Sequence, residues 1–244
     1  MVRRYDVLMA AVVAAVVAPA WGAPVSDMAL SAVEAARSYG AAVRSGDMGW
    51  ALDYMYPPLK KLYAEQYVNR STGNEIENAR RIMGITRESR EQAQARTRSA
   101  LKALRDHYVR IGKERTSKGI KIESFTVQQP VAEYVLTTPS AIVNEAAGSA
   151  NRSRLVVLPT TAVFSGPSRN GQGSVRVERR AHIYAIRDEV VNGPLDRNGF
   201  TLHDTKINKW YFADSNTDIN TLRAFFPNLP LRLTLPDGGE RIVR

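Results

Sequence analysis

The stretch SVRVERRAHIYAIRD, residues 174–188, decides the fold class that we expect for this chain. Its apolar side chains recur at every second position, which predicts a strand with one buried face and one wetter face. The apolar residues of the pattern are Val175, Val177, Ala181, Ile183 and Ala185. His182 and Tyr184 alternate with them and share the other face with charged residues.

Around this stretch, the spacing of apolar residues changes at Gly119 from the helical period of about 3.6 to the strand period of 2. Before it we expect helices over 26–43, 48–56 and 88–111, a further turn or two after Pro57-Pro58, and a loop with a short helix over 69–86. After it we expect strands over 120–128, 131–138, 154–164, 174–187 and 207–214. Their connections are too short for crossover helices, so the sheet should be antiparallel. Helices followed by strands make an α+β domain.

The segment from about residue 217 is expected to extend this domain. Asp218 is a plausible N-cap for a short helix that ends at Pro227. Residues 231–235 and 240–243 flank Pro236-Asp237-Gly238-Gly239, a turn sequence that predicts a small hairpin. We therefore expect residues 21–244 to form one domain with a C-terminal extension.

The first 20 residues are predicted to be a cleaved signal peptide. Arg3 and Arg4 precede an apolar run over 7–17, which is too short to span a bilayer. Ala18-Pro19-Ala20 then offers small residues at both positions that a signal peptidase reads. Cleavage after Ala20 would place the protein in the periplasm or outside the cell, and an uncleaved anchor is the alternative. No later segment is apolar enough to span a membrane.

Composition restricts the possible classes of protein. The chain has no cysteine, which excludes a disulfide scaffold and a thiolate metal site. Its formal net charge of +10 fits anionic envelope polymers or lipid headgroups better than nucleic acid for an exported protein. A solvated basic surface without a specific partner is the alternative interpretation.

Three fragments of the chain resemble known elements. YGAAVRSGDMGWALDYMYP (residues 39–57) looks like a helix, a Gly-Asp break and a second helix; residues 174–188 look like a long bent strand; KWYFADS (209–215) looks like a closing strand. In this order they resemble the nuclear transport factor 2-like superfamily, which includes the SnoaL-like and cystatin-like cone folds. The resemblance implies N-terminal helices packed on a strongly curved antiparallel sheet, which together form a cone. It speaks for fold rather than activity, because ketosteroid isomerase, scytalone dehydratase and many uncharacterised bacterial proteins share this fold.

The resemblance also implies a pocket between the sheet and the helices. The aromatic residues that we expect to line it are Trp50, Tyr54, Tyr134, Tyr184 and Trp210. In a strand over 207–214, Trp210 and Phe212 should face one way and Tyr211 and Ala213 the other. Aromatic residues at such positions fill a core more often than they contact a ligand.

Signatures of catalysis are sparse. The chain has no nucleophile elbow, phosphate loop, dinucleotide fingerprint or HExxH pair, and its three histidines do not share metal-ligand spacing. The resembled enzymes transfer protons, for which His182 with Tyr184, or Asp53, are the candidates. The calcium-like start at Asp214 fails, because Ile219 stands where the loop needs Gly. We therefore expect no metal and no cofactor, and an enzyme is uncertain and disfavoured.

Three functions remain open. The first is a non-catalytic, exported domain that binds a small apolar or anionic ligand, or a protein, with a homodimer or an envelope protein as possible partners. The second is a small-molecule isomerase, dehydratase or hydrolase that uses the cone. The third, weaker hypothesis is a cationic envelope-associated protein.

Overall fold

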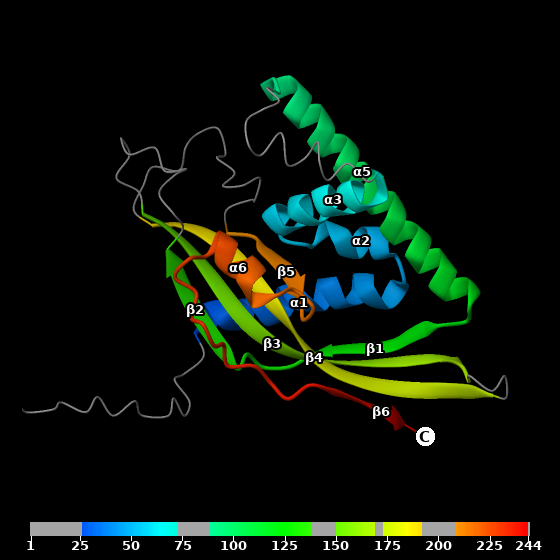
Figure 1. Cartoon of the computed structure of the whole chain (residues 1–244). Coiled ribbons are helices and arrows are strands. Elements are labelled where there is room, and N and C mark those ends of the chain that lie inside the picture. The colour runs from blue at the N-terminus through cyan, green and yellow to red at the C-terminus, as the bar shows by residue number, and fades with distance from the viewer. Residues whose placement is uncertain (1–25, 73–87, 138–149, 169–172, 192–207, 244) are drawn as a thin grey trace, which may run out of the picture.

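The computed structural model describes residues 26–72, 88–137, 150–168, 173–191 and 208–243 and has an α+β fold (Figure 1). Four helices come first: α1 (Asp27–Ser45), α2 (Met48–Asp53), α3 (Pro57–Thr72) and α5 (Arg90–Ser117). The strands are β1 (Lys121–Val127), β2 (Ala132–Thr137), β3 (Ala150–Pro167), β4 (Ser174–Val191), β5 (Trp210–Asp214) and β6 (Gly239–Val243), with α6 (Ile219–Phe225) between the last two. All strand pairs are antiparallel, so the predicted fold class and sheet direction are confirmed. The predicted signal peptide lies outside the described residues.

Local caps fix where the first two helices begin and end. The Oγ of Ser26 accepts a hydrogen bond from Ala29 N at 3.1 Å, which satisfies a free donor at the start of α1. The helix ends at Gly46, whose φ of 77° lies in the left-handed region that glycine adopts without strain. Asp47 then caps α2 by accepting from Trp50 N at 2.9 Å.

Two helices are longer than their sequence patterns predict. Helix α3 runs for 16 residues because Pro57 and Pro58 stand in its first turn, where the backbone N–H groups lack intrahelical partners anyway. Helix α5 begins with a capping box between Ser89 and Gln92 and continues beyond residue 111 to Ser117. It passes through Gly112, where an added Cβ would lie only 2.5 Å from the carbonyl oxygen of Gly46. Gly112 therefore permits α5 to pass close to the turn after α1 instead of ending the helix.

The sheet is built on two long strands. β3 and β4, with 18 residues each, pair along their whole length, and each is flanked by two short strands placed end to end. β2 and β1 follow one another along β3, and β5 and β6 do so along β4. Both flanks are interrupted at the same level, near the pair Pro159–His182. We call β2, β5 and the parts of β3 and β4 beside them the proximal half, and β1, β6 and the parts beside them the distal half (Figure 1).

The predicted hairpin at the C-terminus is wrong. Residues 231–235 form no strand, and β6 pairs with residues 176–180 of β4 instead. The reason is that β5 pairs only with residues 183–187 of β4, which leaves the distal edge of that strand open to β6. The extension between α6 and β6 therefore runs along the sheet and ends at its distal half (Figure 1).

The proximal half is buried on both faces. On one face, residues of α1 pack against Val156, Leu158, Ile183, Ala185, Trp210 and Phe212. On the other face, α6, the extension and the start of α3 cover Leu155, Val157, Tyr184, Ile186, Tyr211 and Ala213. The predicted split within β5 is confirmed. The expectation of a wetter face on β4 is wrong for Tyr184 and Ile186, because a second apolar layer covers that face of the strand.

The outer edge of β5 is also covered. The segment that links α2 to α3 passes along it, with a parallel bridge between Met55 and Phe212. Tyr56 N donates to the carbonyl oxygen of Phe212 at 3.0 Å, and Phe212 N donates to the carbonyl oxygen of Tyr54 at 2.8 Å. The chain thereby passes from the α1 face of the sheet to the opposite face.

Candidate functional site

The five aromatic residues expected to line a pocket are divided between the two faces of the sheet. Trp210 and Tyr54 belong to the cluster beneath α1, where the Nε1 of Trp210 donates to Ser31 Oγ at 2.9 Å. Tyr184 and Tyr134 belong to the cluster on the opposite face. Trp50 is 40% exposed. Because Tyr184 and Trp210 point to opposite sides of neighbouring strands, the five residues do not line one pocket.

Two of the three catalytic candidates are brought together. The Nε2 of His182 and the Oη of Tyr184 lie 3.0 Å apart, where the flanks of the sheet are interrupted. Burial lowers the pKa of His182, and Asp214 raises it to a lesser extent; burial also raises the pKa of Tyr184. The imidazole is therefore held neutral and the phenol protonated. Asp53 is not part of this pair, since its carboxylate accepts two hydrogen bonds from Arg105 on α5, at 2.6 and 3.1 Å.

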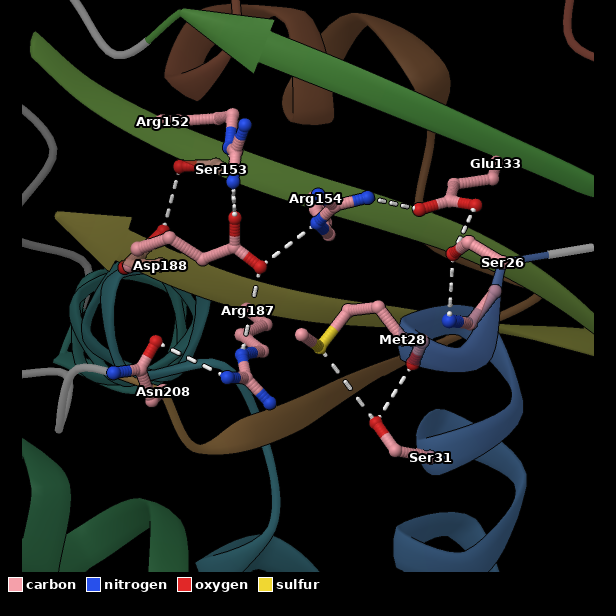
Figure 2. A network of polar contacts seen from close by, with 12 residues as sticks. Ser26, Met28, Ser31, Glu133, Arg152, Ser153, Arg154, Arg187, Asp188 and Asn208 are labelled. Carbon is pink, nitrogen blue, oxygen red and sulfur yellow. Dashed lines mark hydrogen bonds and ion pairs between the residues drawn. The ribbon is translucent and has the colours of Figure 1, made fainter. Parts of the chain in front are cut away.

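The largest polar cluster that the structure describes lies in the proximal half (Figure 2). At its centre Glu189 accepts hydrogen bonds from Arg152 Nε at 2.7 Å and Arg154 Nε at 2.8 Å. The Nε of Arg187 lies 3.6 Å from the same carboxylate, and its guanidinium stands over the Trp210 ring, 5.7 Å from the centroid. The Glu189 side chain is only 6% exposed.

Two further carboxylates lie beside this cluster, Glu133 on the same face of the sheet and Asp188 on the opposite face. Asp188 accepts from Ser153 Oγ at 2.7 Å and from Tyr56 Oη at 3.4 Å, and burial together with Asp188 raises the pKa of that phenol. Glu133 on β2 pairs with Arg154 and accepts from Ser26 Oγ at 2.7 Å (Figure 2).

The cluster is buried, and its arginines converge on two carboxylates, Glu189 and Glu133. Buried charges are tolerated when they are paired in this way. The pairing is incomplete at Arg187, whose buried Nε has no hydrogen-bond partner among the described residues. The cluster joins α1, β2, β3 and β4 to one another.

The distal half presents the opposite situation. Beyond the ends of α1 and α5, a cleft of about 600 Å³ opens over the sheet. Its floor is a row of apolar residues, because Ile122 pairs with Phe164 and Phe164 pairs with Val177 across neighbouring strands. The close approach of Gly112 to Gly46 brings the ends of α1 and α5 to the same place, so the helical layer stops before this row.

The rim of the cleft is cationic. It carries Arg44 from α1, Arg115 from α5, Lys121 from β1 and Arg179 from β4, against the single carboxylate of Glu240. Arg179 lies 3.6 Å from Glu240. In the ranges that the structure describes, the other three cations form no ion pair.

The two helix ends account for only part of this charge. Arg44 and Arg115 stand in the last turns of their helices, where a cation offsets the negative end of the helix dipole. Lys121 and Arg179 belong to strands and have no such role. The cleft therefore holds positive charge in excess of what the fold requires.

A second hollow of about 570 Å³ adjoins the cleft toward the end of the β3–β4 hairpin. Both are lined by Ile120, Phe164 and Val177, so they are parts of one groove. We call this the distal groove. It lies on the α1 face of the sheet, whereas the opposite face of the distal half carries exposed ion pairs such as Arg176–Glu123.

The distal groove is suited to binding rather than to acid–base catalysis. Its one carboxylate is paired with an arginine, and no histidine lines it. In the described part of the chain, no three His, Cys, Asp or Glu side chains are grouped so that they could hold a metal ion. The groove can instead bury apolar surface and neutralise an anion.

Sequence reasoning did not locate this groove, although one of its signals was visible. The apolar face of the strand over 174–187 extends as far as Val175 and Val177, whereas the first helix ends before Gly46. The helix is therefore too short to cover the whole of that face. Arg115 lies beyond the helix expected over 88–111. Its convergence with Arg44 depends on the approach of Gly112 to Gly46, which no local pattern reveals.

No protein-family model matches the chain, and neither does any curated protein or solved structure. Among the described helices, none combines the length and the apolar character needed to cross a bilayer.

Proposed function

We propose that the protein is an exported, non-catalytic binding domain that holds a small, partly apolar anion in the distal groove. One observation carries this proposal: an apolar floor of about three side chains lies directly beneath four cations and one carboxylate. Apolar burial supplies affinity, and the excess positive charge selects for an anion. The cone of the nuclear transport factor 2-like fold is part of the same proposal, supported by the antiparallel sheet with helix α1 on one face.

The test is fluorescence titration of the purified protein with anilinonaphthalene sulfonate, an apolar anion. We expect the double variant Arg115→Gln/Lys121→Gln to bind roughly tenfold more weakly, because two unpaired cations of the rim are lost. The matched control is Arg70→Gln/Arg98→Gln, which removes the same charge from exposed positions on α3 and α5 away from the groove. Equal affinity of the two double variants, or no binding by the parent protein, would contradict the proposal.

The isomerase, dehydratase or hydrolase remains the second candidate function, and one observation favours it. His182 and Tyr184 form a hydrogen-bonded pair of the kind that transfers protons. Tyr184 is only 3% exposed, however, and neither hollow of the distal groove is lined by the pair. A substrate would have to displace the layer formed by α6 and the extension, so we rank this function behind ligand binding.

A further inference from the structure

We infer that the ligand of the distal groove is a single-chain amphiphile, with its anionic head beneath Arg44 and Arg115 and its alkyl chain lying along Phe164, Val175 and Val177 toward Pro167. This inference rests on the proposed function and names the chemical class of the ligand. It is drawn from the polarity, the continuity and the length of the groove.

Polarity distinguishes the two ends of the groove. The hollow at the helix ends is lined by four cations and one carboxylate. The hollow toward the hairpin has no charged residue in its lining; its polar members are Ser165 and Ser168. A ligand that satisfies both ends must be charged at one end and apolar at the other.

Continuity requires one molecule to occupy both ends. Phe164 and Val177 form the floor at the point where the hollows meet, and Ile120 borders both. Ile242 on β6 pairs with Val177 and extends the apolar row toward the edge of the sheet, where it is 74% exposed. A ligand in the groove can therefore bury additional apolar surface against Ile242.

The length of the groove sets the length of the chain. Arg179 pairs with Ala162, and Pro167 at the far end stands five residues farther along β3. At a rise of about 3.3 Å per residue this distance is roughly 16 Å. An extended alkyl chain advances about 1.25 Å per carbon, given bonds of about 1.5 Å, so roughly twelve carbons fill the groove. A compact polycyclic anion would match the charge but would leave the far hollow unfilled.

The experiment is a competition series with hexyl, octyl, decyl, dodecyl and tetradecyl sulfate against anilinonaphthalene sulfonate, each below its micellar concentration. We expect affinity to rise about fourfold for each added methylene and to level off near the dodecyl chain. Inorganic sulfate should not compete, and a neutral dodecyl glycoside should compete more weakly than dodecyl sulfate.

Variants at the two ends distinguish head from chain. Val175→Asn should weaken dodecyl sulfate roughly tenfold and leave hexyl sulfate unchanged. Val175 lines the far hollow and stands four residues from Arg179 along β4, roughly 13 Å away, so only the longer chain reaches it. Arg115→Gln should weaken every member of the series by the same factor. The matched control is Val135→Asn, an equivalent change at a 54% exposed position on β2 in the proximal half. Thermal unfolding of each variant verifies that it is folded.

Each outcome has a distinct meaning. Affinity that does not depend on chain length, with probe binding that still depends on Arg115, would overturn the single-chain inference and leave the proposed function standing. No binding of the probe or of any sulfate would overturn both. If light scattering shows that Val175→Asn converts a dimer into a monomer without changing dodecyl sulfate affinity, the far end of the groove holds a second copy of the chain, and the inference is overturned.

Discussion

The proximal and distal halves of the sheet share two strands and differ in almost everything else. In the proximal half both faces of β3 and β4 are covered, and a buried cluster of three arginines and two carboxylates joins the elements around them. In the distal half, one face carries exposed ion pairs and the other forms an open groove beneath unpaired cations. One pair of long strands thus carries a core covered on both faces at one end and an open apolar surface at the other.

The physical basis of this separation is burial. Apolar side chains between two layers contribute a large transfer free energy, and paired charges there are costly to disrupt. Exposed ion pairs contribute little, because water and salt screen them. Substitutions in the distal half should therefore alter ligand binding while leaving folding intact.

The largest expected difference between the halves concerns apolar burial. Phe226, at the end of α6, is 1% exposed in the layer that covers the second face of the proximal half. Phe226→Ala should lower the free energy of unfolding by about 4 kcal/mol through lost transfer energy and a cavity. Ile242→Ala, the equivalent truncation in the distal half, should change it by less than about 0.5 kcal/mol. Urea denaturation measures both, and similar losses for the two variants would break the comparison.

A smaller effect is expected from a matched pair of charge deletions. Glu189→Gln leaves Arg152 and Arg154 without their shared carboxylate in a buried cluster, and it should cost about 3 kcal/mol of unfolding free energy. Glu178→Gln also removes a carboxylate shared by two arginines, Arg180 and Arg241, but these are exposed on the distal half. We expect no measurable loss there. A comparable loss for both variants, measured by urea denaturation, would show that the distal ion pairs also support the fold.

The smallest effect should appear at the boundary between the halves. Burial holds the pKa of His182 below its ordinary value of about 6.5. The folded protein therefore resists a proton that the unfolded chain accepts, so stability is complete above about pH 6.5 and falls as the pH drops through the lowered pKa.

Comparing His182→Gln with the parent protein isolates this contribution. Between pH 7 and pH 5 the melting temperature of the parent should fall by more than that of the variant, because glutamine does not titrate. If the melting temperatures of the two proteins change in parallel with pH, His182 is as accessible to water as the side chains of the distal half.

Much of the fold follows from patterns that the sequence displays locally. The caps at Ser26, Gly46 and Asp47, the change of period at Gly119 and the antiparallel order of the strands all depend on neighbouring residues. The failures concern distant partners. The strand at 239–243 joins β4 instead of folding back on residues 231–235, because the open edge of β4 is created by the shortness of β5.

The candidate site was less accessible to sequence reasoning for the same reason. Alternation correctly divided Trp210 from Tyr211, yet the second layer that buries Tyr184 comes from residues more than 30 positions later in the chain. The arginines of β3 and β4 carry the same local signature in both halves. The elements that cover these arginines decide whether they form buried ion pairs or line the rim of the distal groove.

The covered edge of β5 has a consequence for self-association. Exposed strand edges serve as templates on which further chains can add, and this is a route to aggregation. The segment around Met55 already occupies the hydrogen-bonding positions of Phe212, so an incoming chain finds no free donors or acceptors at that residue. In the described part of the chain, the edges left for a dimer that extends the sheet are those of β1, β2 and β6.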